Sequence, residues 1–289
     1  MKTLREYIKE AEINKVAIGH FNISNIEALH GIYNAAKKLN LPVIIGVSEG
    51  EEEFIGLNEV AVLVKEIREK DNYPIFLNAD HHYTFESVKS CLDIGFDSAI
   101  IDAVKLPIED NIALTKKCVD YAKELSIKEG KDILIEAELG FIGQSSKILE
   151  SIPEGVSEAT MTNKDDAKYF IEQTGINLLA PSVGNIHGMI KSGNPKLDIN
   201  RIKEIRETCG VPLVLHGGSG ISDDDFKEAI KAGISIIHIN TEIRIAYKEA
   251  LEKYLKENPY EVAPYKILKP AVGAIEEVVY NRLSLFNNI

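Results

Sequence analysis

The chain has 289 residues, of which 45% are hydrophobic, and this length suits one large domain or two small ones. The formal net charge is -12 and no block of lysine or arginine offsets it, so nucleic acid and anionic membranes are excluded as partners. The cysteines form no CxxC pair, the N-terminus lacks an apolar core, and no stretch approaches the roughly 20 apolar residues of a membrane span. We therefore expect an unprocessed cytoplasmic protein.

Apolar runs alternate with amphipathic segments along the chain. Strands are expected at 16–21, 41–47, 74–79, 97–102, 133–138, 177–182, 211–216 and 234–240. Helices are expected at 3–13, after Ser24-Asn25, at 58–70, 84–94, 109–127, 164–174, 199–208 and 223–232, and from 242. A last amphipathic helix is expected at 269–286.

The strands are continuous apolar runs, which are typical of a parallel sheet covered by helices. Eight strand–helix units in this length predict an α/β fold, a closed (β/α)8 TIM barrel. No linker marks a second domain, so we expect a single domain over residues 1–289, with the helix at 3–13 as a lead-in that closes one end. The helix at 269–286 is an addition that packs on the barrel or on a second subunit.

One connection, residues 141–162, is much longer than the others and is rich in serine, glycine and glutamate. It follows the fifth strand, at the face of the barrel where active sites lie. Loops of this length are usually lids or disordered inserts, and this position favours an active-site lid. A shorter loop after the sixth strand carries Lys191.

Several strands end in polar residues that parallel packing would bring to one face. His81, His187 and His216 follow the third, sixth and seventh strands, and Glu138 ends the fifth. For any one histidine the alternative is a structural residue at the rim, but the set predicts a zinc site with an open position. Glu136 and Glu138 share one side of their strand, and burying both is costly unless a cation is present.

Asp80 directly precedes a predicted ligand, so its side chain points away from that of His81 and can reach a substrate held on the metal. The alternative role is a carboxylate that orients a histidine. No lysine occurs within the eight expected strands, which excludes a Schiff-base mechanism of the barrel type. A carbonyl substrate must then be activated by the metal.

A phosphate site is predicted beside these residues. Gly217, Gly218 and Ser219 form a strand-to-helix turn whose N–H groups favour an anion, although glycine also makes tight turns. Asn240-Thr241 ends the neighbouring strand, where such barrels often bind phosphate. Lys191 supplies a cation, unless it is a solvated surface lysine.

With these residues identified, the chain resembles the class II, metal-dependent ketose-bisphosphate aldolases from about Ala17 to Phe286. The shared motifs are Phe21-Asn22, Ser48-Glu49-Gly50, Ala79-Asp80-His81, Asp102 with 106–111, 136–140, 184–188 and 215–220. The resemblance implies Zn²⁺, or another divalent metal, on His81, His187 and His216, with Glu138 at or beside it. It also implies a phosphorylated ketose substrate, a K⁺ or Na⁺ ion near the phosphate, and a homodimer or higher homo-oligomer.

Individual roles follow from the same resemblance. Asp80 would exchange a proton with the ketose C4 hydroxyl, and a glutamate of the lid would donate a proton later in the reaction. The residues implied to hold the phosphate are Gly188, Lys191, Gly217, Ser219, Asn240 and Thr241. Asn22 and Ser48 would contact the substrate.

The chain departs from the family pattern at three places. The first acids of the lid are Glu150 and Glu154, either of which could be the proton donor. His238 stands where the family has asparagine, so we expect it to line the pocket and to replace the hydrogen bond of the amide. Tyr265 stands near the position where many members have an arginine for the second phosphate.

The function expected from the resemblance is reversible cleavage of fructose 1,6-bisphosphate to dihydroxyacetone phosphate and glyceraldehyde 3-phosphate. Tagatose bisphosphate or another ketose phosphate is the alternative substrate. Two other functions remain open from the residues alone, a zinc hydrolase and a non-catalytic sugar-phosphate sensor. Asp80 argues against a sensor, because a binding protein needs no base beside the metal.

Overall fold

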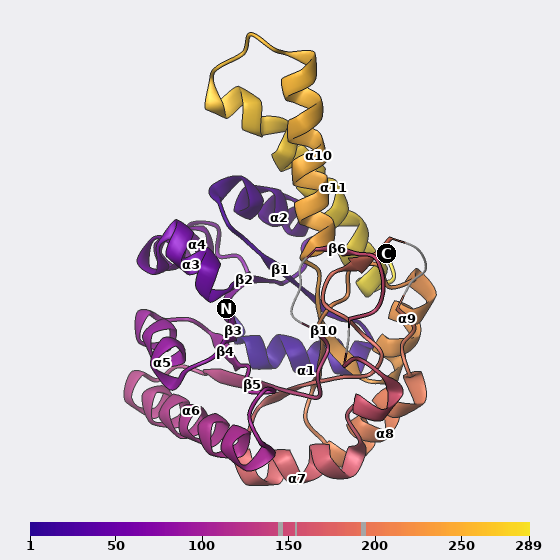
Figure 1. Ribbon diagram of the computed structural model, residues 1–289. Coiled ribbons are helices and arrows are strands. Elements are labelled where there is room, and N and C mark those ends of the chain that lie inside the picture. Colours follow the sequence, from indigo (N-terminus) through magenta and orange to yellow (C-terminus); the bar gives the residue numbers. More distant parts are fainter. Residues whose placement is uncertain (144–146, 154, 192–194) are drawn as a thin grey trace.

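The computed structural model describes residues 1–143, 147–153, 155–191 and 195–289. Eight parallel strands close into a barrel in the order β1-β10-β9-β7-β5-β4-β3-β2 (Figure 1). They are β1 (Ile18–Asn22), β2 (Val43–Val47), β3 (Ile75–His82), β4 (Ser98–Ile101), β5 (Leu134–Leu139), β7 (Leu178–Pro181), β9 (Leu213–Leu215) and β10 (Ile234–His238). The predicted TIM barrel is confirmed.

Helices alternate with these strands and surround the barrel (Figure 1). They are α2 (Ile26–Leu39), α3 (Glu49–Ile55), α4 (Leu57–Asp71), α5 (Phe85–Ile94), α6 (Ile108–Glu129), α7 (Lys164–Thr174), α8 (Ile199–Cys209) and α9 (Asp223–Ala232). No element was expected between strand 41–47 and helix 58–70, and α3 fills most of this connection.

Side chains alternate along each strand between the barrel interior and the surrounding helices. In β3, Leu77 and Ala79 join the apolar layer under the helices, whereas Phe76 joins the interior cluster. Asn78 and Asp80 continue the inward series and form hydrogen bonds with side chains of β1. The strand period therefore places Asp80 inside the barrel, above an apolar floor.

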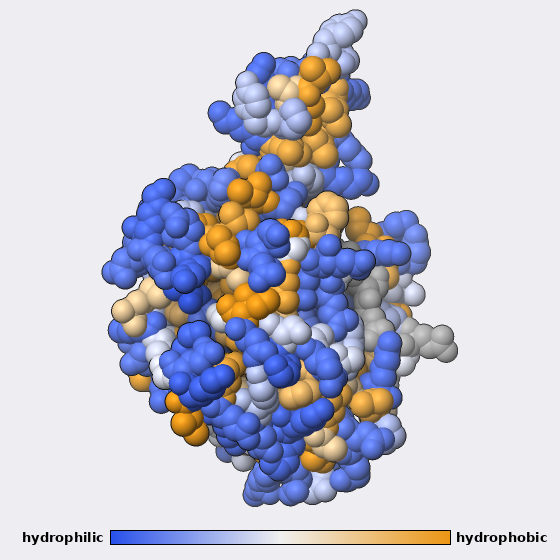
Figure 2. Space-filling model, turned by 90° about the vertical axis from the view of Figure 1, so that its left-hand side faces the viewer, coloured by the Kyte–Doolittle hydropathy of each residue, from blue (hydrophilic) through white to orange (hydrophobic). Residues whose placement is uncertain are grey.

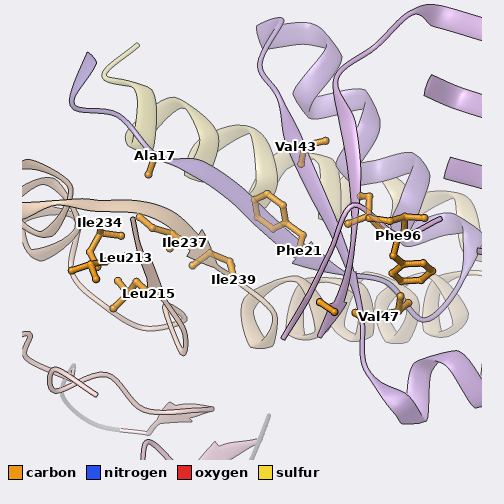
Figure 3. Packing of buried hydrophobic residues seen from close by; sticks show 14 of the residues in the cluster. Ala17, Phe21, Val43, Val47, Phe96, Leu213, Leu215, Ile234, Ile237 and Ile239 are labelled. Atoms are coloured by element: carbon orange, nitrogen blue, oxygen red, sulfur yellow. The ribbon is translucent and has the colours of Figure 1, made fainter. Parts of the chain in front are cut away.

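The floor is sealed by α1 (Leu4–Asn14), the predicted lead-in helix. Its residues Leu4, Ile8 and Ala11 are buried against the inward side chains at the start of the strands. The larger apolar cluster lies between the strands and the outer helices, and Figure 3 shows part of it around Phe21 of β1. Apolar side chains thus fill the lower half of the barrel interior, and polar side chains occupy the upper half.

Two helices, α10 (Thr241–Glu257) and α11 (Pro264–Asn287), form a hairpin that projects beyond the barrel (Figure 1). The start of α11 lies five residues before the predicted 269, with Pro264 in its first turn, where proline is favoured. Figure 2 shows apolar surface on the projecting arm, where Leu255 and Val262 are 44% and 84% exposed. No helix of the described ranges is long and apolar enough to cross a membrane.

The long loop after β5 has structure of its own in its described part. Its strand β6 (Ile148–Leu149) pairs in parallel with β8 (Met189–Ile190), which lies in the loop after β7. A short 3-10 helix, η1 (Glu158–Thr160), follows. The two loops at this end of the barrel are therefore joined by backbone hydrogen bonds.

Candidate active site

The end of β3 presents two functional side chains in different directions. Asp80 is 2% exposed and faces the interior, whereas the next residue, His81, has a left-handed backbone with φ 52°. His81 Nδ1 lies 3.0 Å from Asp102 Oδ2, next to the end of β4. Because that bond occupies Nδ1, Nε2 of His81 is turned toward the barrel axis.

Three further side chains converge on His81 Nε2. His81, Glu138, His187 and His216 each offer a ligand atom, and these atoms lie within 4.8 Å of one another. His187 Nδ1 lies 2.9 Å from the Gly143 carbonyl oxygen, which leaves its Nε2 for the centre. The four predicted ligands are therefore brought together, although they are separated by long stretches of sequence.

The donor set suits a divalent metal. His216 Nε2 lies 2.7 Å from Glu136 Oε1, so each of the three histidines has an outer acceptor of the kind that orients metal ligands. His216 Nδ1 and His81 Nε2 lie 3.0 Å apart, and tetrahedral Zn–N bonds of ~2.0–2.1 Å would separate them by about 3.3 Å. Glu138 Oε2 is buried with no hydrogen-bond partner in the described part of the chain, and a cation would satisfy it.

The electrostatics of the cluster favour the same conclusion. Burial, together with the charge of His81, lowers the pKa values of His187 and His216 to about 3, so both imidazoles are neutral, as metal ligands must be. Burial alone would lower the pKa of His81, but Asp80 and Asp102 raise it to about 10, so a metal would have to displace a proton from this ring. Burial raises the pKa of Glu136 to about 8 and that of Glu138 well above its usual range. A positive ion at the centre would oppose this cost of burying carboxylates.

Asp80 lies beside the cluster. Its Oδ2 accepts a hydrogen bond from Asn22 Nδ2 at 2.8 Å, and its Oδ1 lies 3.9 Å from His81 Nε2. Burial by itself would raise the pKa of Asp80, but His81 and His238 hold it well below the usual range. Asp80 is therefore an ionised carboxylate, oriented by Asn22 and turned toward the predicted metal.

His238 lies deep in the same pocket. Its ring stacks on that of His20 with centroids 3.5 Å apart and an angle of 3°, and it lies 3.9 Å from the His216 ring. Burial lowers the pKa of His238 well below its usual range, so the ring is neutral. Neither ring nitrogen has a hydrogen-bond partner among the described residues, and Nδ1 lies 3.4 Å from Asp80 Oδ1. Nδ1 therefore faces the Asp80 carboxylate, and Nε2 is available to a substrate hydroxyl.

The glycine turn after β9 forms the other wall. Gly217 has φ 61°, and a Cβ there would lie 2.1 Å from the Ile186 carbonyl oxygen. The N–H of Gly218 donates to the His238 carbonyl oxygen at 3.1 Å, so this N–H is already used. A cavity of about 20 Å³ is lined by His81, His187, Gly188, His216, Gly217, Ser219, His238, Asn240 and Thr241.

Comparison with known proteins identifies the family of this chain. The chain matches the family model for class II fructose-bisphosphate aldolase over residues 2–289. The chain belongs to this family. A fructose-bisphosphate aldolase of Geobacillus stearothermophilus is 36% identical over 289 residues, which cover 99% of this chain and 96% of the relative.

Other comparisons agree. A fructose-bisphosphate aldolase of Staphylococcus aureus is 37% identical over 287 residues, covering 98% of this chain and 96% of the relative. The crystal structure of the YdjI aldolase from Escherichia coli K12 has a TM-score of 0.82 at 31% identity and covers 98% and 96% of the two chains. As a class II aldolase the protein is a carbon–carbon lyase, and its class implies a divalent metal.

Lys191 and Glu150, two predicted residues of this aldolase, do not line the cavity. The ammonium group of Lys191, predicted to bind phosphate, forms an ion pair with the carboxylate of Glu150, and the two side chains are 58% and 79% exposed. This pair links the loops that β6 and β8 join. Glu154, the other candidate proton donor, lies outside the described residues.

Two residues beside the aldolase site, Glu51 and Arg244, were not predicted from the sequence. Glu51 Oε2 accepts hydrogen bonds from Asn22 Nδ2 at 2.8 Å and from the Ser48 hydroxyl at 2.8 Å. Its Oε1 accepts from Arg244 Nη2, in the first turn of α10, at 2.7 Å. The spacing of Ser48 and Glu51 is that of a capping box, and this local signal could have revealed the helix.

Proposed function

We propose that the protein cleaves fructose 1,6-bisphosphate reversibly to dihydroxyacetone phosphate and glyceraldehyde 3-phosphate, with Zn²⁺ as its metal. The observation that carries the proposal is the ionised Asp80 beside the cluster of His81, Glu138, His187 and His216. When bound, Zn²⁺ supplies a Lewis acid that stabilises negative charge on the ketone oxygen. The fit of the four donor groups supports this metal.

Asp80 is the proton acceptor in this proposal. Cleavage of the C3–C4 bond requires removal of the proton from the C4 hydroxyl, and a general base must lie within hydrogen-bond reach of that proton. Asn22 occupies Oδ2 of Asp80, which leaves Oδ1 for the hydroxyl. In the direction of synthesis the same oxygen returns the proton.

The glycine wall binds the phosphate of the dihydroxyacetone half. Gly188, Gly217, Ser219, Asn240 and Thr241 line the cavity, and the N-terminal end of α10 adds a favourable dipole. Gly218 shapes the turn, since its own N–H is used. A monovalent cation near this phosphate, K⁺ or Na⁺, would be held by backbone oxygens.

Two cationic side chains at the rim, Arg244 and Lys191, bind the phosphates of a bisphosphate in this proposal. Arg244 is 39% exposed, and its hydrogen bond to Glu51 uses one of the five N–H groups of its guanidinium. We assign it to the second phosphate, for which Tyr265 offers no charge. Lys191 exchanges its partner Glu150 for the first phosphate as the substrate enters. Ser48 contacts the substrate beside Arg244.

The segment 141–162 acts as the lid. The cavity of about 20 Å³ holds roughly one water molecule, so a sugar phosphate enters only when the paired loops move. Opening breaks the Lys191–Glu150 contact and frees Glu150. Glu150 or Glu154 then donates the proton that completes dihydroxyacetone phosphate.

The projecting arm supports a homodimer. Apolar side chains such as Leu255 and Val262 lie exposed on it, and a second copy of the chain would cover them. We place the enzyme in the cytoplasm, because its three cysteines are free and two of them are buried.

A coupled assay of aldol cleavage on fructose and tagatose bisphosphates tests the proposal. It compares the zinc-loaded enzyme, the enzyme with chelator, and Asp80→Ala. We expect activity that is lost with chelator and lost in Asp80→Ala, while that variant keeps its zinc. The ratio of the two rates identifies the sugar. Stoichiometric zinc without cleavage of any ketose phosphate would favour a sugar-phosphate sensor.

A further inference from the structure

The short helix α3 carries a buried carboxylate with an unusual number of donors. The Glu51 side chain is 10% exposed. Its Oε2 accepts from Asn22 Nδ2 at 2.8 Å, from the Ser48 hydroxyl at 2.8 Å and from the Ser48 N–H at 3.0 Å. Its Oε1 accepts from Arg244 Nη2 at 2.7 Å. One carboxylate thus joins β1, the start of α3 and the first turn of α10.

These bonds determine which way the Asn22 amide points. Asn22 Nδ2 donates both to Glu51 Oε2 and to Asp80 Oδ2, each at 2.8 Å. If the amide were reversed, its oxygen would face two carboxylates and both bonds would be lost. The amide oxygen instead points toward Gly46, where an added Cβ would lie 2.5 Å from it. Glu51 therefore favours the one orientation in which Asn22 donates to Asp80.

The orientation of Asn22 in turn sets the orientation of Asp80. With Oδ2 held by Asn22, Oδ1 lies 3.4 Å from His238 Nδ1 and 3.9 Å from His81 Nε2, beside the reacting centre. A carboxylate free to rotate would present either oxygen at varying distance from the substrate. A displacement of the order of 1 Å at such a group can lower a rate about a hundredfold.

We infer that Glu51 is a positioning residue of the reaction, which acts on Asp80 through Asn22 and holds Arg244 at the rim. The inference rests on the proposed function of Asp80 and extends it to a helix that contributes no group to the metal. Removal of the Glu51 carboxylate leaves one N–H of Asn22 and the Arg244 guanidinium without their acceptor. The expected effect of Glu51→Ala is a loss of kcat of about tenfold to a hundredfold.

A double-mutant cycle on the zinc-loaded enzyme tests this pathway. The variants are Glu51→Ala, Asn22→Ala and the double variant, and kcat and KM are measured for cleavage of the bisphosphate. If Glu51 acts through Asn22, the double variant is no slower than Asn22→Ala alone. Losses that multiply, or an unchanged kcat in Glu51→Ala, would overturn the inference.

Further variants separate positioning from folding. Glu51→Gln keeps the size and one acceptor oxygen, so it should recover part of the loss. Glu53→Gln, on an exposed residue of the same helix, is the matched control and should keep the wild-type kcat. Zinc content and thermal unfolding of each variant show whether it is folded and loaded.

A crystal structure of Glu51→Ala gives a result that does not depend on activity. We expect the bond between Asn22 Nδ2 and Asp80 Oδ2 to lengthen or break. An unchanged bond would overturn the inference even if the wild-type enzyme cleaved no bisphosphate. Absence of cleavage by the wild type would instead count against the proposed function.

Discussion

Asp102 offers a direct test of how the metal ligands are oriented. Its Oδ2 lies 3.0 Å from His81 Nδ1, and its side chain is 5% exposed, so the bond is shielded from water. Asp102→Ala removes this acceptor and lets the His81 ring rotate or change tautomer. Loss of such an outer partner typically weakens metal binding tenfold to a hundredfold. That range corresponds to about 1.4–2.8 kcal/mol of binding free energy.

Competition with a chromophoric chelator measures the affinity of each variant for Zn²⁺. Asp102→Asn is the matched control, because its amide oxygen can still accept from His81 Nδ1, so it should lose less affinity than Asp102→Ala. Thermal unfolding of the metal-free proteins shows whether the substitutions disturb the fold. Equal zinc affinity in Asp102→Ala and the wild type would refute the view that this carboxylate orients the ligand.

Four further outcomes are expected. Chelation of the metal should abolish cleavage and lower the unfolding midpoint, because a ligand of the folded state stabilises it; calorimetry with and without Zn²⁺ measures the shift. Gly217→Ala should raise KM at least about tenfold, since its methyl would meet the Ile186 carbonyl oxygen. Gly130→Ala has a similar φ of 65° but open space around it, so it controls for backbone strain alone. Arg244→Ala should raise KM for a bisphosphate and leave that for a ketose 1-phosphate unchanged in steady-state assays. His238→Asn should alter the ratio of fructose to tagatose bisphosphate cleavage, and identical kinetics on both sugars would contradict this role.

The strands and their polar ends could be predicted because both depend on local sequence. Apolar runs locate the strands, and the two-residue alternation along each strand identifies the inward positions. Parallel strands covered by helices are apolar on their outer side, and alternate residues point inward. Asp80 and Glu138 follow from that alternation once the strands are located. Closure of the barrel then brings their ends together, so residues far apart in sequence could be assigned to one site.

The helix α3 could not be predicted from its apolar pattern. Its sequence, Glu49–Ile55, has four acids, and Phe54 is 78% exposed, so Ile55 is its one apolar side chain packed against the core. Hydrogen bonds to distant residues hold it in place, Glu51 with Arg244 and Glu52 with His82 Nε2 at 2.8 Å. Such long-range polar contacts leave no periodic signal in the sequence.

The orientation of the Lys191 side chain could not be predicted from the sequence either. Its position in the loop after β7 could be assigned, but a long exposed side chain takes the direction of whichever partner is in reach. That partner is Glu150, which comes from another loop through the pairing of β6 and β8. The exposed pair is weakly held, so a phosphate can compete for the lysine.

Along the barrel axis, the lower part of the interior stabilises the fold and the upper part carries the groups for chemistry. The lower layer is apolar and sealed by α1, whereas the upper layer carries Glu136 and Glu138, which are 1% and 2% exposed. A barrel selected for stability alone would continue the apolar layer upward, because buried carboxylates without a cation are costly. Burial raises the pKa of Glu138 well above its usual range, so without metal the protonated form is favoured. A divalent ion beside Glu138 would favour its carboxylate form. The polar upper layer is therefore the part of the barrel interior whose stability would depend on a bound cation.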